Sequence, residues 1–134
     1  RSDLELNRKT GAIKLARAVA AVDAGLIVNP DGLRNQIEGG IIQSASWTLL
    51  ESVRHDRTRV VTRTWADYPI LRFEDIPPVQ VHLIDRPTER SLGVGEGSQG
   101  PTVAAIANAL AHTTGRRLRA LPFTPEKVLA GIKA

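Results

Sequence analysis

The chain has 134 residues, of which 42% are hydrophobic and 24% are charged. This length suits one domain with a core of its own, and the proportion of hydrophobic to charged residues excludes a wholly disordered chain. The absence of cysteine excludes disulfides, thiolate metal sites and a cysteine nucleophile. The uncharged stretch 41–50 is too short to cross a bilayer, so we expect no membrane-spanning segment. Because methionine is also absent and the chain opens within an expected strand, we expect a piece of a longer protein.

The charge balance gives 18 basic and 14 acidic residues, a net charge of +4. Such a charge would suit a phosphate-bearing partner. However, the arginines are spread along the chain, and the aromatic residues are only two Trp, one Tyr and two Phe. A nucleic-acid binder concentrates its charge or offers aromatic platforms for the bases. We therefore expect no nucleic-acid partner.

The first expected elements are two strands joined by a tight turn. Leu4 and Leu6 alternate with polar residues, which is the period of a half-buried strand. Residues 8–11 form a polar run that ends in glycine, which is typical of a hairpin turn. The next stretch, Ala12–Asp23, suits a helix by its alanines and a strand by its place after the turn. We predict a strand there.

A long helix is predicted from about Asp31 to Val53, with Asp31 as its N-cap. Two adjacent glycines, Gly39 and Gly40, interrupt it, and each costs roughly 1 kcal/mol relative to alanine in a helix. Such a cost indicates the close approach of another backbone or a ligand, or a tight contact between helices. The apolar and small residues that recur at helical spacing are Leu33, Ile37, Ile41, Ser44 and Thr48.

The rest of the chain adds two strands and two shorter helices. A run of 16 residues, 85–100, contains Pro87 and four glycines and is predicted to be a long loop. The whole chain, residues 1–134, is then expected to be one α+β domain. The other elements expected are strands at 59–63 and 79–84, a helix from Pro101 to about Thr113 that ends at Gly115, and a last helix capped by Thr124.

The glycine-rich end of this loop, residues 93–101, is the first candidate for chemistry. Its glycines let the backbone approach a ligand closely, and a helix N-terminus follows directly. The pattern matches neither the P-loop nor the dinucleotide fingerprint, and Glu96 would repel a phosphate. A single carboxylate held among glycines fits a general base, although the local pattern alone favours a solvated loop residue.

Gln36, on the long helix, is the second candidate. Its amide offers both a donor and an acceptor, which suits the edge of a heterocycle, but a polar helix face would look the same. The histidines at positions 55, 82 and 112 lie far apart in sequence and lack metal-ligand spacing. No metal site formed by protein side chains is therefore expected.

Taken together in order and spacing, several segments resemble the C-terminal part of the molybdenum-binding large subunit of the xanthine oxidase and aldehyde oxidase family. The isoquinoline 1-oxidoreductase β-subunit type is the branch that they resemble most. The resemblance covers nearly the whole chain, and it also favours a strand over residues 12–23. The matching segments are 20–25, 28–30, 35–43, 93–96, 105–110, 114–119 and 121–126.

The resemblance implies an oxidoreductase that uses water to hydroxylate an N-heterocycle or an aldehyde at an electron-poor carbon. Its cofactor would be molybdenum held by a molybdopterin, with the cytosine dinucleotide form as one alternative. Glu96 would match the family's Gly-x-Gly-Glu general base. Gln36 would match the glutamine that contacts the pterin, and backbone groups of Gly93, Val94 and Gly95 would line the cofactor.

The resemblance also implies partners. Other cofactor contacts would lie upstream in the same large subunit, and iron–sulfur clusters would be carried by a small subunit. We expect the isolated chain to bind no cofactor and to be inactive. One departure is that Gly97 and Ser98 follow Glu96 where many members have two prolines, which argues against purine substrates. A non-catalytic interaction domain with the same fold remains the alternative.

Overall fold

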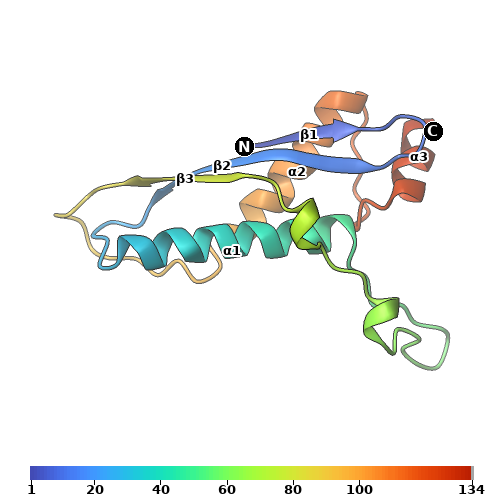
Figure 1. Cartoon of the computed structure of the whole chain (residues 1–134), viewed down its shortest axis with the longest axis horizontal. Coiled ribbons are helices and arrows are strands. Elements are labelled where there is room, and N and C mark those ends of the chain that lie inside the picture. The colour runs from blue at the N-terminus through green and yellow to red at the C-terminus, as the bar shows by residue number, and fades with distance from the viewer. Residues whose placement is uncertain (134) are drawn as a thin grey trace.

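The computed structural model describes residues 1–133, which form three strands and three α-helices. The strands lie in one sheet in the order β1–β2–β3, and α1 runs along one face of it (Figure 1). This mixed sheet with one long and two shorter helices is the predicted α+β fold. The bounds are β1 (Ser2–Leu6), β2 (Ile13–Asp23), α1 (Pro30–Leu49), β3 (Val79–Ile84), α2 (Gln99–Thr114) and α3 (Pro125–Lys133).

The turn between β1 and β2 confirms the predicted hairpin. The Asn7 carboxamide oxygen accepts hydrogen bonds from the backbone N–H groups of Lys9 and Thr10, at 3.0 and 3.1 Å. Gly11 has a φ of 78°, and a Cβ built on it would lie 2.2 Å from the carbonyl oxygen of Pro125. Only glycine satisfies both the left-handed backbone and the contact with the start of α3.

The stretch after this turn is a strand, as predicted. β2 pairs antiparallel with β1 and parallel with β3, so its middle is the centre of the sheet. Its alanines fit because they allow α1 to lie close to the sheet: Ala18 is buried there, in one cluster with Leu33, Ile37 and Ile41 of α1. Tertiary packing, and not helix propensity, therefore decides this segment.

Both predicted ends of the long helix need correction. The N-cap is Asn29 and not Asp31: the Asn29 side-chain oxygen accepts the backbone N–H of Gly32 at 2.9 Å. Pro30 follows it because proline lacks an N–H and its φ suits the first helical position. The helix ends at Leu49 and not at Val53, since the Thr48 carbonyl oxygen accepts the backbone N–H of Phe123 at 2.7 Å.

The buried face of α1 joins two apolar clusters. All five residues predicted for that face, from Leu33 to Thr48, are buried. One cluster lies between α1, β2 and β3. The other lies where α1, α2 and α3 meet the hairpin, and its buried members are Leu15, Ala45, Leu49, Ile106, Leu110, Phe123 and Val128.

The strand predicted at residues 59–63 does not form. Residues 50–78, which we call the arm, leave the end of α1, extend away from the sheet and helices, and return to α1 at Leu71, whose N–H bonds the Ser46 hydroxyl at 3.0 Å (Figure 1). The arm contains one isolated antiparallel bridge, His55 with Val60, and two short 3-10 helices, Trp65–Asp67 and Phe73–Asp75. Its valines have strand propensity, but no sheet edge lies beside them, and Val60 remains 47% exposed. A strand needs such an edge to pair its backbone groups.

The other predicted elements are confirmed within about two residues. The strand at 79–84 is β3, and the glycine-rich loop leads into α2, which begins at Gln99 with Pro101 in its first turn. Gly115 ends α2 with a φ of 72°, and α3 follows Thr124 directly. No helix in the described part of the chain combines the length and the apolar character that crossing a membrane requires.

Candidate functional site

Gln36 and the glycine-rich loop, singled out separately in the sequence, lie together in the structure. The Gln36 amide nitrogen Nε2 donates a hydrogen bond to the carbonyl oxygen of Gly95 at 2.6 Å. The two residues are 59 positions apart in sequence. Gln36 lies on the second turn of α1, and its side chain is exposed to solvent. The contact therefore joins both candidate motifs into one surface site.

The loop that carries Glu96 is held against the connection between β2 and α1. Its backbone pairs with that connection twice, through Leu26 N–H to Glu89 O at 3.2 Å and Leu92 N–H to Ala24 O at 3.0 Å. Gly25, with a φ of 64°, allows this approach, because a Cβ there would lie 2.1 Å from the Arg90 carbonyl oxygen. The loop is thus fixed directly before its glycines.

An ion pair strengthens the same connection at the end of β2. The Asp23 carboxylate accepts the Gly25 backbone N–H at 3.0 Å and pairs with Arg86 at 3.0 Å. The Gly25 hydrogen bond first, and then the Arg86 guanidinium, hold the pKa of Asp23 below its usual value. This carboxylate is therefore charged at neutral pH and serves to position the loop.

Ser98 anchors the far end of the loop, and the sequence analysis missed it. It is 8% exposed, and its hydroxyl donates a hydrogen bond to the Ile37 carbonyl oxygen at 3.1 Å. A Cβ on Gly40 would lie 2.3 Å from the Ser98 hydroxyl oxygen, whereas a Cβ on Gly39 would meet nothing within 4 Å. The two glycines had indicated a close approach. Only Gly40 makes one, and it is a contact with the start of α2.

Glu96 lies at the exposed tip of this anchored loop. Its backbone carbonyl accepts the Gln99 N–H at 3.2 Å, which starts the turn into α2. Its carboxylate forms neither a hydrogen bond nor an ion pair with any of residues 1–133. Gly93 and Gly95 beside it are equally open, because a Cβ on either would meet nothing within 4 Å. The side chain and the glycine backbone are thus free to contact a further molecule.

The donors of this surface are amides and not metal ligands. Among residues 1–133, no group of three or more His, Asp or Glu side chains could hold a metal ion, and His55, His82 and His112 are all exposed. The surface instead offers the Gln36 carboxamide and the backbone of residues 93–97. Amide donors and acceptors match the hydrogen-bonding edge of a pterin or the oxygens of a phosphate.

The chain belongs to the molybdopterin cofactor-binding domain family, whose sequence profile matches residues 1–77. It is thus a molybdenum-cofactor-binding domain of the xanthine oxidase family of oxidoreductases. This confirms the family resemblance found in the sequence.

Named relatives agree with the family. A nicotinate dehydrogenase subunit of Pseudomonas putida is 42% identical over 98% of this chain, and the isoquinoline 1-oxidoreductase β subunit of Brevundimonas diminuta is 36% identical over 92%. The crystal structure of quinoline 2-oxidoreductase from Pseudomonas putida 86 superimposes over 97% of the chain with a TM-score of 0.85 and 30% identity. The chain spans only 11%, 16% and 18% of these three proteins, respectively.

Proposed function

We propose that this chain is the C-terminal cofactor-binding part of the large subunit of a molybdenum hydroxylase. The reaction is the hydroxylation of an N-heterocycle or an aldehyde at an electron-poor carbon, with water as the oxygen source. The observation that carries the proposal is the hydrogen bond from Gln36 to Gly95, which puts both family motifs on one surface. Family membership supports the cofactor, and the named relatives support the reaction class.

In this proposal, Gln36 and the backbone of Gly93, Val94 and Gly95 contact the molybdopterin. Gln36 uses one N–H to hold the loop, which leaves its second N–H and its carbonyl oxygen for the pterin edge. Gly93 and Gly95 are exposed, and a Cβ on either would meet nothing within 4 Å. Val94 is half-buried with the cluster around Ile37, so it contributes its peptide group and not its side chain. The proposed cofactor is a molybdenum-bearing molybdopterin, and its cytosine dinucleotide form is one alternative.

Glu96 is the proposed general base. When bound, the molybdenum cofactor would supply the acceptor for the hydrogen and the two electrons that leave the substrate carbon as its C–H bond breaks. The Glu96 carboxylate takes the proton from the water-derived oxygen that attacks this carbon. The anchors at Ala24 and Ile37 hold the loop at both ends, so the carboxylate is positioned although the residue is exposed. Positioning of this kind is what makes a general base effective.

An N-heterocycle is the substrate class that the relatives favour. Nicotinate, isoquinoline and quinoline, which appear in the names of three relatives, are all aromatic rings containing nitrogen. The carbon beside such a nitrogen is electron-poor and open to attack by an oxygen nucleophile. An aldehyde is the second class, since an aldehyde oxidoreductase subunit of Escherichia coli is 31% identical over 95% of the chain.

The proposed partners follow from the size of the chain. The rest of the large subunit would supply the remaining contacts to the cofactor and the substrate pocket. A small subunit with iron–sulfur clusters would carry the electrons away. Both are proposed because two of the relatives are named as subunits and are several times longer than this chain.

The substitution Glu96→Gln in the full-length enzyme tests this function. It keeps the size and the hydrogen-bonding capacity of the side chain but removes its basicity. We expect turnover to fall by roughly two to four orders of magnitude, which is the usual contribution of a positioned base. Molybdenum content should stay unchanged, because the glycine backbone makes the proposed cofactor contact.

Glu89→Gln is the matched control. Glu89 lies in the same loop, and its carboxylate makes only an exposed ion pair with Arg86 at 3.3 Å. Such pairs contribute little, so activity should remain near wild type. A Glu96→Gln enzyme with full molybdenum content and near wild-type turnover would refute the base. A full-length subunit that never contains molybdenum would instead support a non-catalytic interaction domain, which the 82% exposed Trp65 and 95% exposed Phe73 of the arm also favour.

A further inference from the structure

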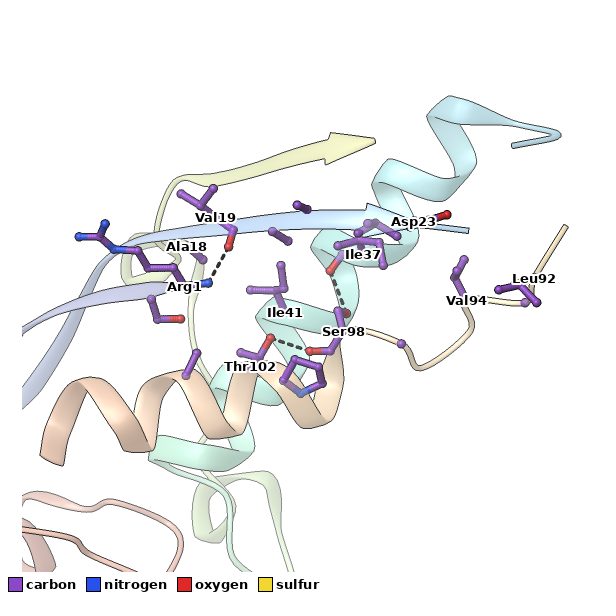
Figure 2. A pocket seen from close by; sticks show the side chains of 18 residues that line it. Arg1, Ala18, Val19, Asp23, Ile37, Ile41, Leu92, Val94, Ser98 and Thr102 are labelled. Carbon is purple, nitrogen blue, oxygen red and sulfur yellow. Dashed lines mark hydrogen bonds between the residues drawn. The ribbon is translucent and has the colours of Figure 1, made fainter. Parts of the chain in front are cut away.

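The short segment that carries Glu96 is tied to α1 at two consecutive residues. The Gln36 side chain donates to the Gly95 carbonyl oxygen at 2.6 Å, directly before Glu96. The Ser98 hydroxyl donates to the Ile37 carbonyl oxygen at 3.1 Å, two residues after it (Figure 2). Because both contacts reach the same turn of α1, one helix holds the segment at its two ends.

Hydrogen bonds restrain both peptide groups that flank the Cα atom of Glu96. A peptide group is planar, so the bond from Gln36 to the Gly95 carbonyl also restrains the plane that contains the Glu96 N–H. On the other side, the Glu96 carbonyl accepts the Gln99 N–H at 3.2 Å. The backbone of Glu96 is thereby held, and only the torsions of its side chain remain for the exposed carboxylate to explore.

Ser98 occupies a site built for its side chain between α1 and α2. It is buried, and the missing side chain of Gly40 leaves the room that its hydroxyl fills. Its carbonyl oxygen accepts both the N–H and the hydroxyl of Thr102, at 3.1 and 2.7 Å (Figure 2). Contacts on both helices therefore fix where the segment ends.

The Ser98 hydroxyl is not used to cap the helix that it precedes. A serine at this position usually accepts a backbone N–H from the first turn of its own helix through its side chain. Ser98 is the N-cap of α2 but makes no such side-chain bond. Its hydroxyl is used on α1 instead, so its contribution is to attach the loop to that helix.

We propose that Ser98 and Gln36 are positioning residues for Glu96, which together fix the backbone of the base relative to α1. The inference rests on the proposed function, in which Glu96 is the general base and Gln36 contacts the pterin. Gln36 would then touch both the cofactor and the segment that carries the base. The base and the cofactor would thus be placed by the same turn of α1, which sets the distance between them.

Hydrogen exchange in the full-length subunit, prepared from a host that makes no cofactor, tests this attachment without any need for activity. Ser98→Ala removes the hydroxyl. We expect the amides of Gly97 and Gln99, which bond within the segment, to exchange roughly 3- to 10-fold faster. The Leu92 amide, which bonds Ala24 before the glycines, should be unchanged. Equal acceleration of all three would indicate general destabilisation; that result, or no acceleration, would overturn the proposal.

Turnover of the loaded enzyme, expressed per bound molybdenum, gives the second readout. In Ser98→Ala we expect kcat to fall roughly 10- to 100-fold, the effect of a displaced catalytic group. KM should stay within about twofold, because the buried hydroxyl is not part of substrate binding. A merely structural role would lower the number of loaded sites and not the turnover of each. Unchanged kcat per molybdenum would therefore overturn the proposal.

Gln36→Ala provides a second variant for the same exchange measurement. It should accelerate the amides of Gly97 and Gln99, because it releases the other end of the segment. The acceleration in the double variant with Ser98→Ala should differ from the product of the two single effects, since both side chains hold one segment. Independent effects that simply multiply would contradict a joint role.

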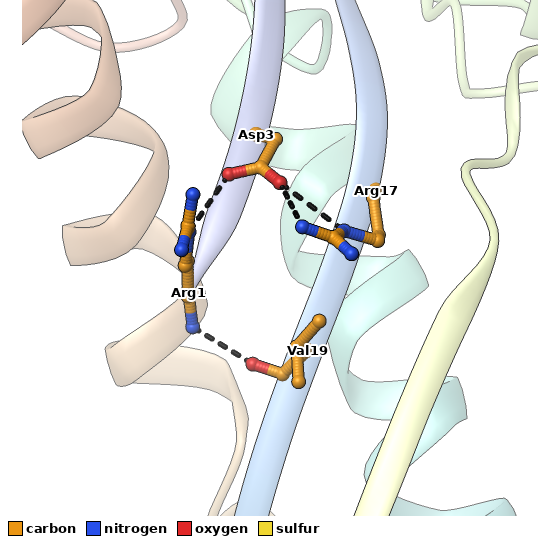
Figure 3. A network of polar contacts seen from close by, with 4 residues as sticks. All are labelled: Arg1, Asp3, Arg17 and Val19. Carbon is orange, nitrogen blue, oxygen red and sulfur yellow. Dashed lines mark hydrogen bonds and ion pairs between the residues drawn. The ribbon is translucent and has the colours of Figure 1, made fainter.

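Two control variants remove polar contacts outside the segment. Ser44→Ala removes a fully buried hydroxyl that donates to carbonyl oxygens within α1 itself. Arg17→Ala breaks an exposed ion pair with Asp3 at 2.7 Å, between β1 and β2 (Figure 3). Neither variant should change the exchange of the loop amides or kcat per molybdenum. If either behaves like Ser98→Ala, the effect is not specific to the segment and the proposal fails.

The inference and the proposed function can fail separately. An active Glu96→Gln enzyme would refute the general base, whereas the exchange rates would still report how the segment is held. Unchanged exchange in Ser98→Ala would refute the positioning role even if Glu96→Gln abolished turnover.

Discussion

Gln36 has more hydrogen-bonding groups than its contact with the loop requires. Its carboxamide has two N–H donors and one carbonyl oxygen, and one N–H is used on the Gly95 carbonyl at 2.6 Å. Gln43, two turns further along α1, also uses its side-chain amide, by accepting a hydrogen bond from Gln99 at 3.2 Å. The two glutamines therefore both link α1 to the segment that follows β3, but only Gln36 reaches the glycines.

The substitution Gln36→Ala should weaken cofactor retention more than it disturbs the fold. A hydrogen-bonding group of the buried heterocycle would lose its partner, at a cost of roughly 1–3 kcal/mol, or about 5–150-fold in affinity. Molybdenum content of the full-length enzyme after extensive dialysis measures the effect. Gln43→Ala is the control and should retain its molybdenum. Equal retention by the two variants and the wild type would remove Gln36 from the site.

The start of α2 approaches the backbone of α1 most closely at Gly40. Ser98, directly before α2, fits against Gly40 and donates its hydroxyl to the Ile37 carbonyl. The backbone N–H and the hydroxyl of Thr102 both bond the Ser98 carbonyl, at 3.1 and 2.7 Å. The loop that carries Glu96 ends at this junction, so the packing of two helices positions the proposed base.

Gly40→Ala and Gly39→Ala should therefore have opposite effects on stability. At Gly39, alanine meets nothing within 4 Å, so its higher helix propensity should stabilise by up to about 1 kcal/mol. At Gly40, the new Cβ displaces the buried Ser98 hydroxyl, and overpacking of this kind costs roughly 1–3 kcal/mol. Urea unfolding of the two variants gives the comparison. Adding Ser98→Ala to Gly40→Ala should recover part of the loss, and two equally stable single variants would argue against the contact.

The anchor at the end of β2 should respond to acid. Because the pKa of Asp23 is lowered in the folded chain, its contacts with Gly25 and Arg86 stabilise the fold above the usual carboxyl pKa of 3.8. This contribution is lost as the pH falls through the lowered value. The amide resonance of Gly25, followed by NMR as the pH is lowered, should shift in that range and not above it. In Asp23→Asn, which keeps an acceptor for Gly25, the shift should disappear; its persistence would assign the titration to another group.

For the whole molecule, local patterns predicted the elements that pack on one another. The helical spacing of apolar and small residues from Leu33 to Thr48 was enough to predict α1. The polar turn and the alternation of apolar and polar residues were enough to predict the hairpin of β1 and β2. Residues 59–63 had the same local pattern as a strand but no edge to pair with. Pattern alone could not exclude that strand, since the missing partner is a long-range property.

The candidate site was predicted in its parts and not in its assembly. Gln36 and Gly95 stood out separately by residue type, but their contact depends on how α1 packs against the sheet and α2. Ser98 carried no signal, because one serine in a glycine-rich loop is ordinary. Gly40 did indicate a close approach, yet its partner could be named only from the fold. Sequence thus predicts which residues to examine, and the fold shows which of them meet.

The isolated chain should bind no molybdenum cofactor stably and should show no turnover. Gln36 and Glu96 both lie on exposed surface. Cofactor sites bury most of the ligand, about 70–90% of its surface, which two exposed elements of one face cannot do. Purification of the chain from a host that makes the cofactor, followed by metal analysis, checks this expectation, with the full-length subunit from the same host as the control. Near-stoichiometric molybdenum with turnover in the isolated chain would show that the site is complete without the rest of the subunit.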